Sequence, residues 1–534
     1  MKKDTRLIVS LFFIYLVSNV NAADVSEVVT QSGTYQGHSS EHASGITVFK
    51  GIAYASPPVR DLRWKPPASP IPFAGVRDAS RVGPACWQAR NSDASLYARG
   101  NLERSEDCLY LNVFTGADDS TESLPVMVWF HGGGNTAGHG GPLIFDGSNL
   151  AARGAVIVTA NYRLGTLGFL AHPALTAESN NDSSGNYGIL DQLAVLHWVQ
   201  DNIVNFGGDP GRVTIFGQSA GGTDVCLLMS SPLAEGLIHG VIGQSPGCIK
   251  LDRSLTDGNN SGHQAGLSYA SQLGVAGKDS AALQQLRELP AEQLVQAGVG
   301  GGTIIDGWVI PDAPYTLLET GQNNQIPVMV GGLAHENHGL QHTSPEISEQ
   351  QLDSYLQTSF GESAGQVKSA YSDILASSPL DARKQIATDN GFLLSSRMWG
   401  RLVEHRGSNA YVYFFTREPP AFRLYVPEMP DLHSDGGQRH YGAYHSGELA
   451  YVFDNLGLVG IGWDDDDRAL AETVADYWVS FARNGNPNGD GLPNWPAYRA
   501  SEDRVQILGT NVRSAIHPKK AELDMLEEIY LSQR

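Results

Sequence analysis

Positive charge is scarce in this sequence of 534 residues. Lysine and arginine total 36 against 57 aspartates and glutamates, which gives a formal net charge of −21 at pH 7. Such an acidic balance argues against nucleic acid or an anionic membrane as the binding partner. Internal repeats and long low-complexity linkers are also missing. With 41% hydrophobic and 17% charged residues, the composition is that of a soluble globular protein.

Membrane-length apolar runs are missing as well. A basic start is followed by an apolar stretch, residues 7–17, and by a small-residue exit that ends at Ala22. This layout predicts a secretory signal peptide over residues 1–22, cleaved after Ala22. The stretch is shorter than the roughly 20 residues that span a membrane, although an uncleaved anchor helix is the alternative. The mature protein is therefore expected to be secreted or periplasmic, with no membrane segment.

Cysteine is rare, with four in the whole chain. In an exported protein four cysteines suggest disulfides, and they allow three connectivities. Their order favours pairing Cys86 with Cys108 and Cys226 with Cys248. The first pair would close a loop of about twenty residues, worth roughly 3 kcal/mol. Cys226 falls in an expected helix, where a buried free thiol is the alternative to a disulfide.

Short apolar runs recur along the chain and fit strands that are buried on both faces of a sheet. They lie at residues 125–130, 155–162, 212–217, 239–245, 326–332 and 410–415. Helix-like stretches occur among them at 188–203, 219–230 and 468–483. This alternation predicts an α/β fold with a large, mostly parallel central sheet flanked by helices. We expect one domain over residues 23–534, with helical cap-like insertions around 250–320 and 340–405.

The segment "FGQSAGG" follows one of these predicted strands directly and opens a predicted helix. Gly217, Ser219 and Gly221 form a Gly-x-Ser-x-Gly motif in the strand–turn–helix setting of a nucleophile elbow. The sharp turn would hold the serine hydroxyl at the carboxyl edge of the sheet. A glycine-rich turn with a spectator serine is the alternative. Because a serine at its ordinary pKa is a poor nucleophile, it needs a base and a stabiliser of negative charge.

A stabiliser of this kind is indicated by "WFHGGGN", residues 129–135, which follows another predicted strand. Glycine triplets of this type supply backbone N–H groups to the oxyanion hole of esterases. We expect Gly133, Gly134 and Ala220, the residue after the nucleophile, to be the donors. A dinucleotide-binding loop is the alternative, but the G-x-G-x-x-G spacing is missing.

Several segments together resemble the type-B carboxylesterases, the cholinesterase-like branch of the α/β-hydrolases, in the manner of secreted bacterial members. The resemblance covers nearly the whole mature chain. It is carried by "FKGIAYASPPVRDLRWKPP" (49–67), "EDCLYLNV" (106–113), "FDGSNLAARGAVIVTANYRLGTLGFL" (145–170), "GNYGILDQLAVLHWVQDNIVNFGGDPGRVTIFGQSAGG" (185–222) and "DYWVSFARNGNPN" (476–488).

The resemblance implies a catalytic triad of serine, glutamate and histidine. It assigns the acid to Glu336 in "VGGLAHENHG" and the base to His445 in "YHSGELAYVF". It also places a supporting serine at Ser245 and pairs Cys108 with Cys86. Near these residues the chain departs from the family pattern at two positions. His335 precedes the acid where the family often has aspartate, and Pro246 follows Ser245 where glycine is usual.

Two segments contain residues that could bind a metal ion. "HENH", residues 335–338, has its second histidine one position too early for a zinc-protease helix. The four acids at 464–467 fit either a calcium site or the amino end of a helix, and the helix is favoured. We therefore expect neither a metal nor a cofactor. Further histidines that could compete with His445 for the role of base are His338, His342, His433 and His440.

These features predict a serine carboxylesterase that acts through an acyl-enzyme intermediate. The expected partner is a small-molecule ester, and nothing in the sequence points to a particular oligomeric state. A lipase and a non-catalytic cholinesterase-like protein are the competing interpretations of the whole chain.

The substrate preference is predicted from two features near the proposed site. Asn135 stands where the family usually has an aromatic residue, which predicts a more polar pocket wall. Arg423, Arg439 and His440 precede the proposed base and suggest an enzyme specialised for carboxylated esters, such as tricarballylate-type mycotoxin esters. A solvated loop is the plainer interpretation of these three cations.

Overall fold

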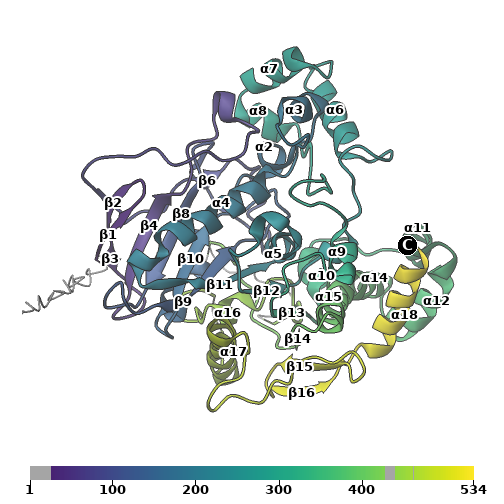
Figure 1. Cartoon of the computed structure of the whole chain (residues 1–534). Helices are drawn as coiled ribbons and strands as arrows, with labels where there is room; N and C mark the ends of the chain where they lie inside the picture. The colour runs from purple at the N-terminus through teal and green to yellow at the C-terminus, as the bar shows by residue number, and fades with distance from the viewer. Residues whose placement is uncertain (1–25, 427–438, 461) are drawn as a thin grey trace, which may run out of the picture.

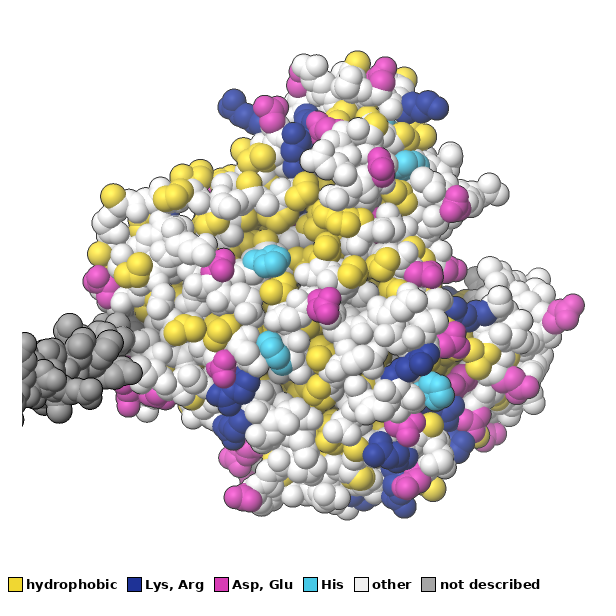
Figure 2. All heavy atoms as spheres, in the orientation of Figure 1, with side chains coloured by type: hydrophobic (Ala, Val, Ile, Leu, Met, Phe, Trp, Pro, Cys, Tyr) yellow, Lys and Arg dark blue, Asp and Glu magenta, His cyan; other side chains and the backbone are white. Residues whose placement is uncertain are grey.

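The computed structural model describes residues 26–426, 439–460 and 462–534. The predicted signal peptide, residues 1–22, lies outside these ranges, as does His433. Within them, none of the helices combines the length and apolar character needed to cross a membrane. Acidic side chains are spread over the face of the molecule in Figure 2, in keeping with the net charge of −21.

A mixed sheet of eleven strands forms the centre of the described part (Figure 1). Its order is β16-β15-β14-β13-β12-β11-β9-β10-β8-β4-β3. Pairing is parallel from β15 to β10 and antiparallel at both margins, where β16 pairs with β15 and β8 with β10. The six predicted strands are β9 to β14, and they are the contiguous centre of the sheet. The predicted fold class is confirmed.

The strands of the described part have the following bounds: β1 Glu27–Thr30, β2 Gly33–Gln36, β3 His38–Ser39, β4 Thr47–Ala53, β5 Val76–Asp78, β6 Ala85–Cys86, β7 Arg104–Ser105, β8 Tyr110–Thr115, β9 Leu124–Phe130, β10 Val156–Ala160, β11 Gly208–Gln218, β12 Gly240–Gln244, β13 Val328–Leu333, β14 Ala410–Phe415, β15 Arg504–Leu508 and β16 Arg513–Ile516.

The helices are α1 Ser148–Ala151, α2 Gly165–Phe169, α3 Pro173–Glu178, α4 Tyr187–Asn202, α5 Ala220–Ser230, α6 Gly262–Gln272, α7 Ser280–Glu288, α8 Ala291–Gln296, α9 Pro314–Thr320, α10 Glu336–Leu340, α11 Glu349–Phe360, α12 Ala364–Ala370, α13 Ser372–Leu375, α14 Pro379–Thr388, α15 Leu394–His405, α16 Leu449–Val452, α17 Asp465–Asn484 and α18 Lys520–Ser532.

Both faces of the sheet are buried, which explains the unbroken apolar runs. In β9, Val126 and Val128 belong to the core that also holds residues of α4 and α5. Met127 and Trp129, which point the other way, belong to a second core that includes residues of α17. Successive side chains of a strand face opposite sides, so a strand covered by helices on both sides must be apolar throughout.

The acidic run before α17 caps that helix. The side chain of Asp464 accepts a hydrogen bond from the backbone N–H of Asp467, and the Asp467 side chain accepts one from the N–H of Asp464. This reciprocal pair satisfies two N–H groups that the first turn of a helix leaves unpaired. The helix ends at Gly485 in the left-handed conformation. The structure thus places these acids at a helix amino terminus, as favoured from the sequence.

The two expected insertions are helical in the structure. Residues 250–320 contain α6 to α9, and residues 340–405 contain α11 to α15. Figure 1 shows α6, α7 and α8 gathered with α3 at one end of the molecule, while α11 and α12 lie beside α18 at another. Their assignment as caps within a single domain stays a prediction.

Two disulfides join the four cysteines, Cys86 with Cys108 and Cys226 with Cys248. The pairing suggested by their order is confirmed, and the alternative of a free thiol at Cys226 is wrong. The first bond closes a loop that runs from β6 to the start of β8. The second ties α5 to the segment after β12.

Candidate active site

Ser219 stands at the junction between β11 and α5. Its backbone has φ 59° and ψ −120°, a conformation that a non-glycine residue rarely adopts. The N–H of Ser219 donates to the carbonyl of Gln244 at 2.8 Å, and its own carbonyl accepts from the N–H of Thr223 at 2.9 Å. These bonds hold the strained turn in place, and strain of this kind persists only where the surroundings enforce it.

The two motif glycines are required by close backbone contacts. A Cβ at Gly221 would stand 2.0 Å from the carbonyl oxygen of Phe130, the last residue of β9. A Cβ at Gly217 would stand 2.5 Å from the backbone of Gly221. The turn is therefore the compact elbow expected from the sequence, pressed against the neighbouring strand.

Glu336 begins α10, just after β13, and is fully buried. Its Oε1 accepts two hydrogen bonds, from the Ser245 hydroxyl at 2.6 Å and from the backbone N–H of Leu333 at 2.8 Å. Its Oε2 lies 2.5 Å from Nδ1 of His445. The carboxylate is thus fixed by donors from the ends of two adjacent strands, with one oxygen left for the imidazole.

His445 lies on a segment that is paired with the start of α10. The N–H of His335 donates to the carbonyl of Ala443 at 3.0 Å, and Nδ1 of His335 accepts from the N–H of Ala443 at 3.1 Å. The Tyr97 hydroxyl donates to the carbonyl of His445 at 2.9 Å, and the Phe392 ring packs 4.9 Å from the imidazole. His335, which departs from the family pattern, therefore helps to position the segment that carries His445.

The other imidazole nitrogen faces Gln218, the residue before the elbow serine. Nε2 of His445 is 3.1 Å from Nε2 of Gln218. With Nδ1–H directed at Glu336, Nε2 is the acceptor and the amide is the donor. The side-chain oxygen of Gln218, Oε1, in turn accepts a hydrogen bond from the Ser446 hydroxyl at 3.0 Å. Among the described residues no hydrogen bond reaches the Ser219 hydroxyl. The motif contained Gln218, but its sequence position alone did not indicate this contact.

The glycine triplet lies against the elbow. A Cβ at Gly132 would be 3.0 Å from Cβ of Ser219. Gly133 has φ +115°, and a Cβ there would be 2.0 Å from the carbonyl oxygen of Ala137. The carbonyl of Gly133 accepts from the N–H groups of Thr136 and Ala137, both at 3.1 Å. The loop therefore folds back on itself next to the serine.

Asn135 is buried and ties this loop to its surroundings. Its Nδ2 donates to Oδ1 of Asp224 at 2.8 Å, and its Oδ1 accepts from the Tyr162 hydroxyl at 2.9 Å. Oδ2 of Asp224 accepts from Gln192 at 2.7 Å. Burial raises the pKa of Asp224 to about 7, and the two hydrogen bonds oppose that rise. The Asn135 amide is thus engaged with the framework, and its role in the pocket wall stays a prediction.

A second buried carboxyl, Glu448, lies near Glu336. Its Oε1 accepts from Gln244 at 3.2 Å, and no hydrogen bond from the described residues reaches its buried Oε2. Burial, followed by the negative charge of Glu336, raises the pKa of Glu448 to about 8. A neutral carboxyl beside Glu336 avoids placing two negative charges together in the core.

The cations expected near the base make contacts elsewhere. Arg439 pairs with Asp467 and with Asp464, which are the capping residues of α17. Nε of Arg423 donates to the carbonyl of Asp93 at 2.8 Å. His440 is exposed, and its ring contacts Tyr441. The described contacts of these three residues are with the framework, and their role in substrate binding stays a prediction.

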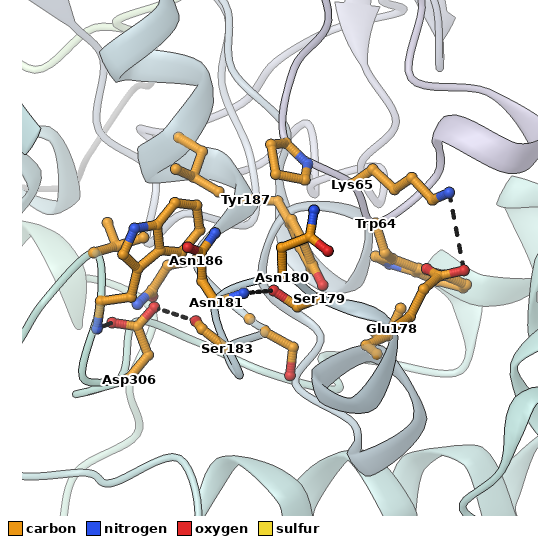
Figure 3. Close-up of a pocket in the computed structure, with 17 residues that line it drawn as sticks. Trp64, Lys65, Glu178, Ser179, Asn180, Asn181, Ser183, Asn186, Tyr187 and Asp306 are labelled. Atoms are coloured by element: carbon orange, nitrogen blue, oxygen red, sulfur yellow. Dashed lines mark hydrogen bonds and ion pairs between the residues drawn. The ribbon is translucent and has the colours of Figure 1, made fainter.

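Figure 3 shows a pocket of about 200 Å³ that contains none of the predicted triad residues. Trp64, Tyr187 and Trp308 are among the residues that line it. The Ser183 hydroxyl donates to Asp306 at 2.6 Å within it.

In the described residues no cluster of histidine, cysteine and acidic side chains is arranged to hold a metal ion.

Comparison with known proteins decides the family. The sequence matches the carboxylesterase family over residues 24–526. The chain belongs to this family. It is a carboxylesterase of type B and therefore a carboxylic ester hydrolase. It is 35% identical to the fumonisin B1 esterase of Sphingopyxis macrogoltabida, over 92% of this chain and 88% of that protein. It is 34% identical to a medium-chain fatty acyl-CoA hydrolase precursor of Anas platyrhynchos, over 97% of this chain and 95% of that protein.

Solved esterase structures resemble this carboxylesterase over most of its length. The structure of a carboxylesterase of Geobacillus stearothermophilus matches with a TM-score of 0.79 and 31% sequence identity. The match covers 94% of this chain and 100% of that one. A thermophilic PNB esterase has a TM-score of 0.79 and 30% identity with the same coverage of this chain. The fold is thus that of the α/β-hydrolases.

Proposed function

We propose that this carboxylesterase cleaves its substrates with Ser219 as nucleophile, His445 as general base and Glu336 as the residue that orients the base. The observation that carries the proposal is the 2.5 Å contact between Nδ1 of His445 and Oε2 of Glu336. That bond leaves Nε2 unprotonated and facing the elbow. Only a nitrogen in this state can remove a proton from the serine.

The reaction proceeds in two halves. Ser219 attacks the ester carbonyl carbon while its proton passes to Nε2 of His445. The backbone N–H groups of Gly133, Gly134 and Ala220 hold the resulting oxyanion. Collapse of the intermediate breaks the bond to the alcohol, which leaves with the proton from His445. Water then attacks the acyl-enzyme by the same route and releases the acid and the free serine.

Gln218 has a part in the first step. In this structure its amide occupies Nε2 of His445, so the amide must yield that nitrogen to the Ser219 hydroxyl when substrate binds. Catalytic hydrogen bonds often form only in the substrate complex. The presence of Ser219, Glu336 and His445 together argues against a non-catalytic protein, because adhesion-type relatives would have no use for the buried acid–base pair.

The experiment is a covalent serine probe combined with an ester panel. Wild type should react with a fluorophosphonate and hydrolyse short-chain nitrophenyl esters. Ser219→Ala should lose labelling, and its kcat should fall about 10⁵- to 10⁶-fold. Ser354→Ala, an exposed serine of α11, serves as the control and should behave as wild type. Labelling of Ser219→Ala at the wild-type rate would refute the assignment. The panel should include long-chain esters, to test for a lipase, and fumonisin B1, the ester named for the bacterial relative.

Export of the protein is part of the proposal. The two disulfides support it, because disulfides persist in oxidising compartments. Amino-terminal sequencing of the protein recovered from its native host should find Ala23 as the first residue.

A further inference from the structure

Arg99 is a buried cation that no acidic side chain of the described chain neutralises. It lies in the loop closed by Cys86 and Cys108, and the residue is only 5% exposed. Its Nε and Nη1 are enclosed by protein and have no hydrogen-bond partner among the described residues. Its close companion is the Tyr425 ring, which the guanidinium carbon overlies at 3.5 Å. Burial lowers the pKa of this guanidinium, as expected for a charge held away from water.

Two further buried arginines show what Arg99 is missing. Arg163 makes two bonds to Asp191, at 2.7 and 2.8 Å. Arg397 bonds Asp503 at 2.7 Å. A guanidinium stays charged in proteins and is costly to bury unless a carboxylate or phosphate pairs with it. A buried arginine that no carboxylate of the described residues satisfies is able to bind an anion.

The place of Arg99 connects it to the proposed oxyanion hole. Its Nη2 is 3.0 Å from the position that a Cβ of Gly133 would occupy. Two residues earlier, Tyr97 donates its hydroxyl to the carbonyl of His445. The same loop thus contacts the base through Tyr97 and flanks the glycine triplet through Arg99.

Two neighbouring histidines leave this charge unchanged. Burial, together with the charge of Arg99, lowers the pKa of both His131 and His139 to about 3. Both imidazoles are therefore neutral at ordinary pH, and Arg99 provides the positive charge at this side of the loop. An anion bound there would be attracted by a single, fixed guanidinium in a site of low dielectric constant.

We propose that Arg99 binds a free carboxylate of the substrate, so that this enzyme prefers esters that carry a negative charge a few bonds from the scissile carbonyl. The proposal rests on the catalytic assignment above and adds the substrate class. A carbonyl oxygen held by the Gly133 N–H leaves the rest of the ester within reach of Nη2. The substrate carboxylate would accept a charge-assisted hydrogen bond from the Arg99 guanidinium. Because the guanidinium charge is delocalised, this contact would neutralise the whole group. The recognising cation is then Arg99, while Arg439 is engaged with the cap of α17.

The test compares matched esters with and without the charge. On the acyl side the pair is 4-nitrophenyl hydrogen glutarate and its methyl ester. On the alcohol side the pair is 4-acetoxybenzoate and its methyl ester. The measured quantity is the ratio of kcat/KM for the charged ester to that for the neutral one. In Arg99→Gln this ratio should fall about 10- to 150-fold in at least one pair, the range expected for a hydrogen bond to a charged group. The pair that responds identifies the side of the ester that carries the charge.

Arg90→Gln is the matched control, because Arg90 lies in the same disulfide loop, is exposed and pairs with Asp93 at 3.0 Å. It should leave both ratios at the wild-type value. Unchanged ratios in both pairs for Arg99→Gln would overturn the proposal. Thermal unfolding and fluorophosphonate titration of Ser219 would verify that each variant is folded and how much of it is active.

If Arg99→Gln does not fold, inhibition of neutral-ester hydrolysis by glutarate and tricarballylate replaces it. Both acids should inhibit wild type competitively and Arg99→Lys at least several-fold more weakly, because lysine cannot reproduce the planar fork. Equal inhibition of the two proteins would overturn the proposal. Failure of the catalytic assignment would look different, since wild type would then neither label at Ser219 nor cleave the neutral esters.

Discussion

Asn135 and Asp224 join the two parts of the proposed oxyanion hole through a 2.8 Å hydrogen bond between Nδ2 and Oδ1. Asn135 follows the glycine triplet directly, and Asp224 lies in α5, the helix that Ala220 begins. Because the donors of Gly133 and Gly134 are on one part and that of Ala220 on the other, this bond fixes their spacing. Geometry held in advance is what makes such donors effective.

Asn135→Ala should therefore reduce both stability and catalysis. The substitution leaves Oδ1 of the buried Asp224 without its donor, which should lower the free energy of unfolding by about 1.5–3 kcal/mol. It also loosens the glycine loop, so kcat should fall about 10- to 100-fold. This loss is smaller than the loss expected when an oxyanion-hole donor is removed altogether. Urea unfolding and steady-state kinetics measure the two effects. Asn180→Ala, at an exposed position, is the control, and wild-type kcat in Asn135→Ala would contradict the prediction.

The two glycines of the loop should differ in their tolerance of alanine. At Gly133 a Cβ would collide with the Ala137 carbonyl oxygen at 2.0 Å, whereas at Gly134 its nearest neighbour is the Thr136 hydroxyl at 3.7 Å. Both substitutions keep the N–H group. Gly133→Ala should abolish esterase activity. Gly134→Ala should retain activity and lower the free energy of unfolding by only roughly 1–2 kcal/mol, because alanine must adopt the left-handed backbone conformation there. Kinetics on a neutral ester, with unfolding curves, would expose any reversal of this order.

The two disulfides offer a matched comparison, since each has a sequence separation of 22. Replacing either pair by alanine should lower the free energy of unfolding by about 3 kcal/mol, because equal loops restrict the unfolded chain equally. Only the Cys86–Cys108 loop carries Tyr97 and Arg99. The Cys86→Ala/Cys108→Ala variant should therefore also lose discrimination between charged and neutral esters. Equal discrimination in both double variants, measured by kcat/KM, would count against this.

Glu448 should make the protein less stable as the pH rises. Its pKa is about 8 in the folded protein, against an ordinary value of 4.5. Between these values the folded state binds one more proton than the unfolded state, so the free energy of unfolding falls with increasing pH. Glu448→Gln removes this contribution, which is at most about 1.4 kcal/mol per pH unit.

Urea unfolding of wild type and Glu448→Gln from pH 5 to pH 8 measures the effect. The difference between them should grow in favour of the variant as the pH rises. Glu346→Gln, at an exposed position, should run parallel to wild type. A Glu448→Gln curve that also runs parallel to wild type would show that Glu448 titrates alike in both states.

The contacts within the proposed site share one property, which is long separation along the chain. His445 and Glu336 are 109 residues apart, Ser245 and Glu336 are 91 apart, and Asn135 and Asp224 are 89 apart. The resemblance to a known family singled out the first three residues, but nothing in the residues alone paired them. Asp224 and Gln218 lie in or beside the serine motif, and their contacts depend on strands and loops from elsewhere.

By itself the sequence determined the central strands, the elbow at Ser219 and the glycine loop before Asn135. These features are encoded by consecutive residues. A strand that is buried on both faces requires a continuous apolar run, and a close backbone contact requires glycine at that position. Only the tertiary structure decided which buried arginine has no carboxylate partner among the described residues. Arg423, Arg439 and Arg99 look alike in sequence, but Arg439 meets the acids of α17 while Arg99 is buried beside Gly133. That difference depends on which distant segments pack together, because a charge is satisfied only by the neighbours that folding brings to it.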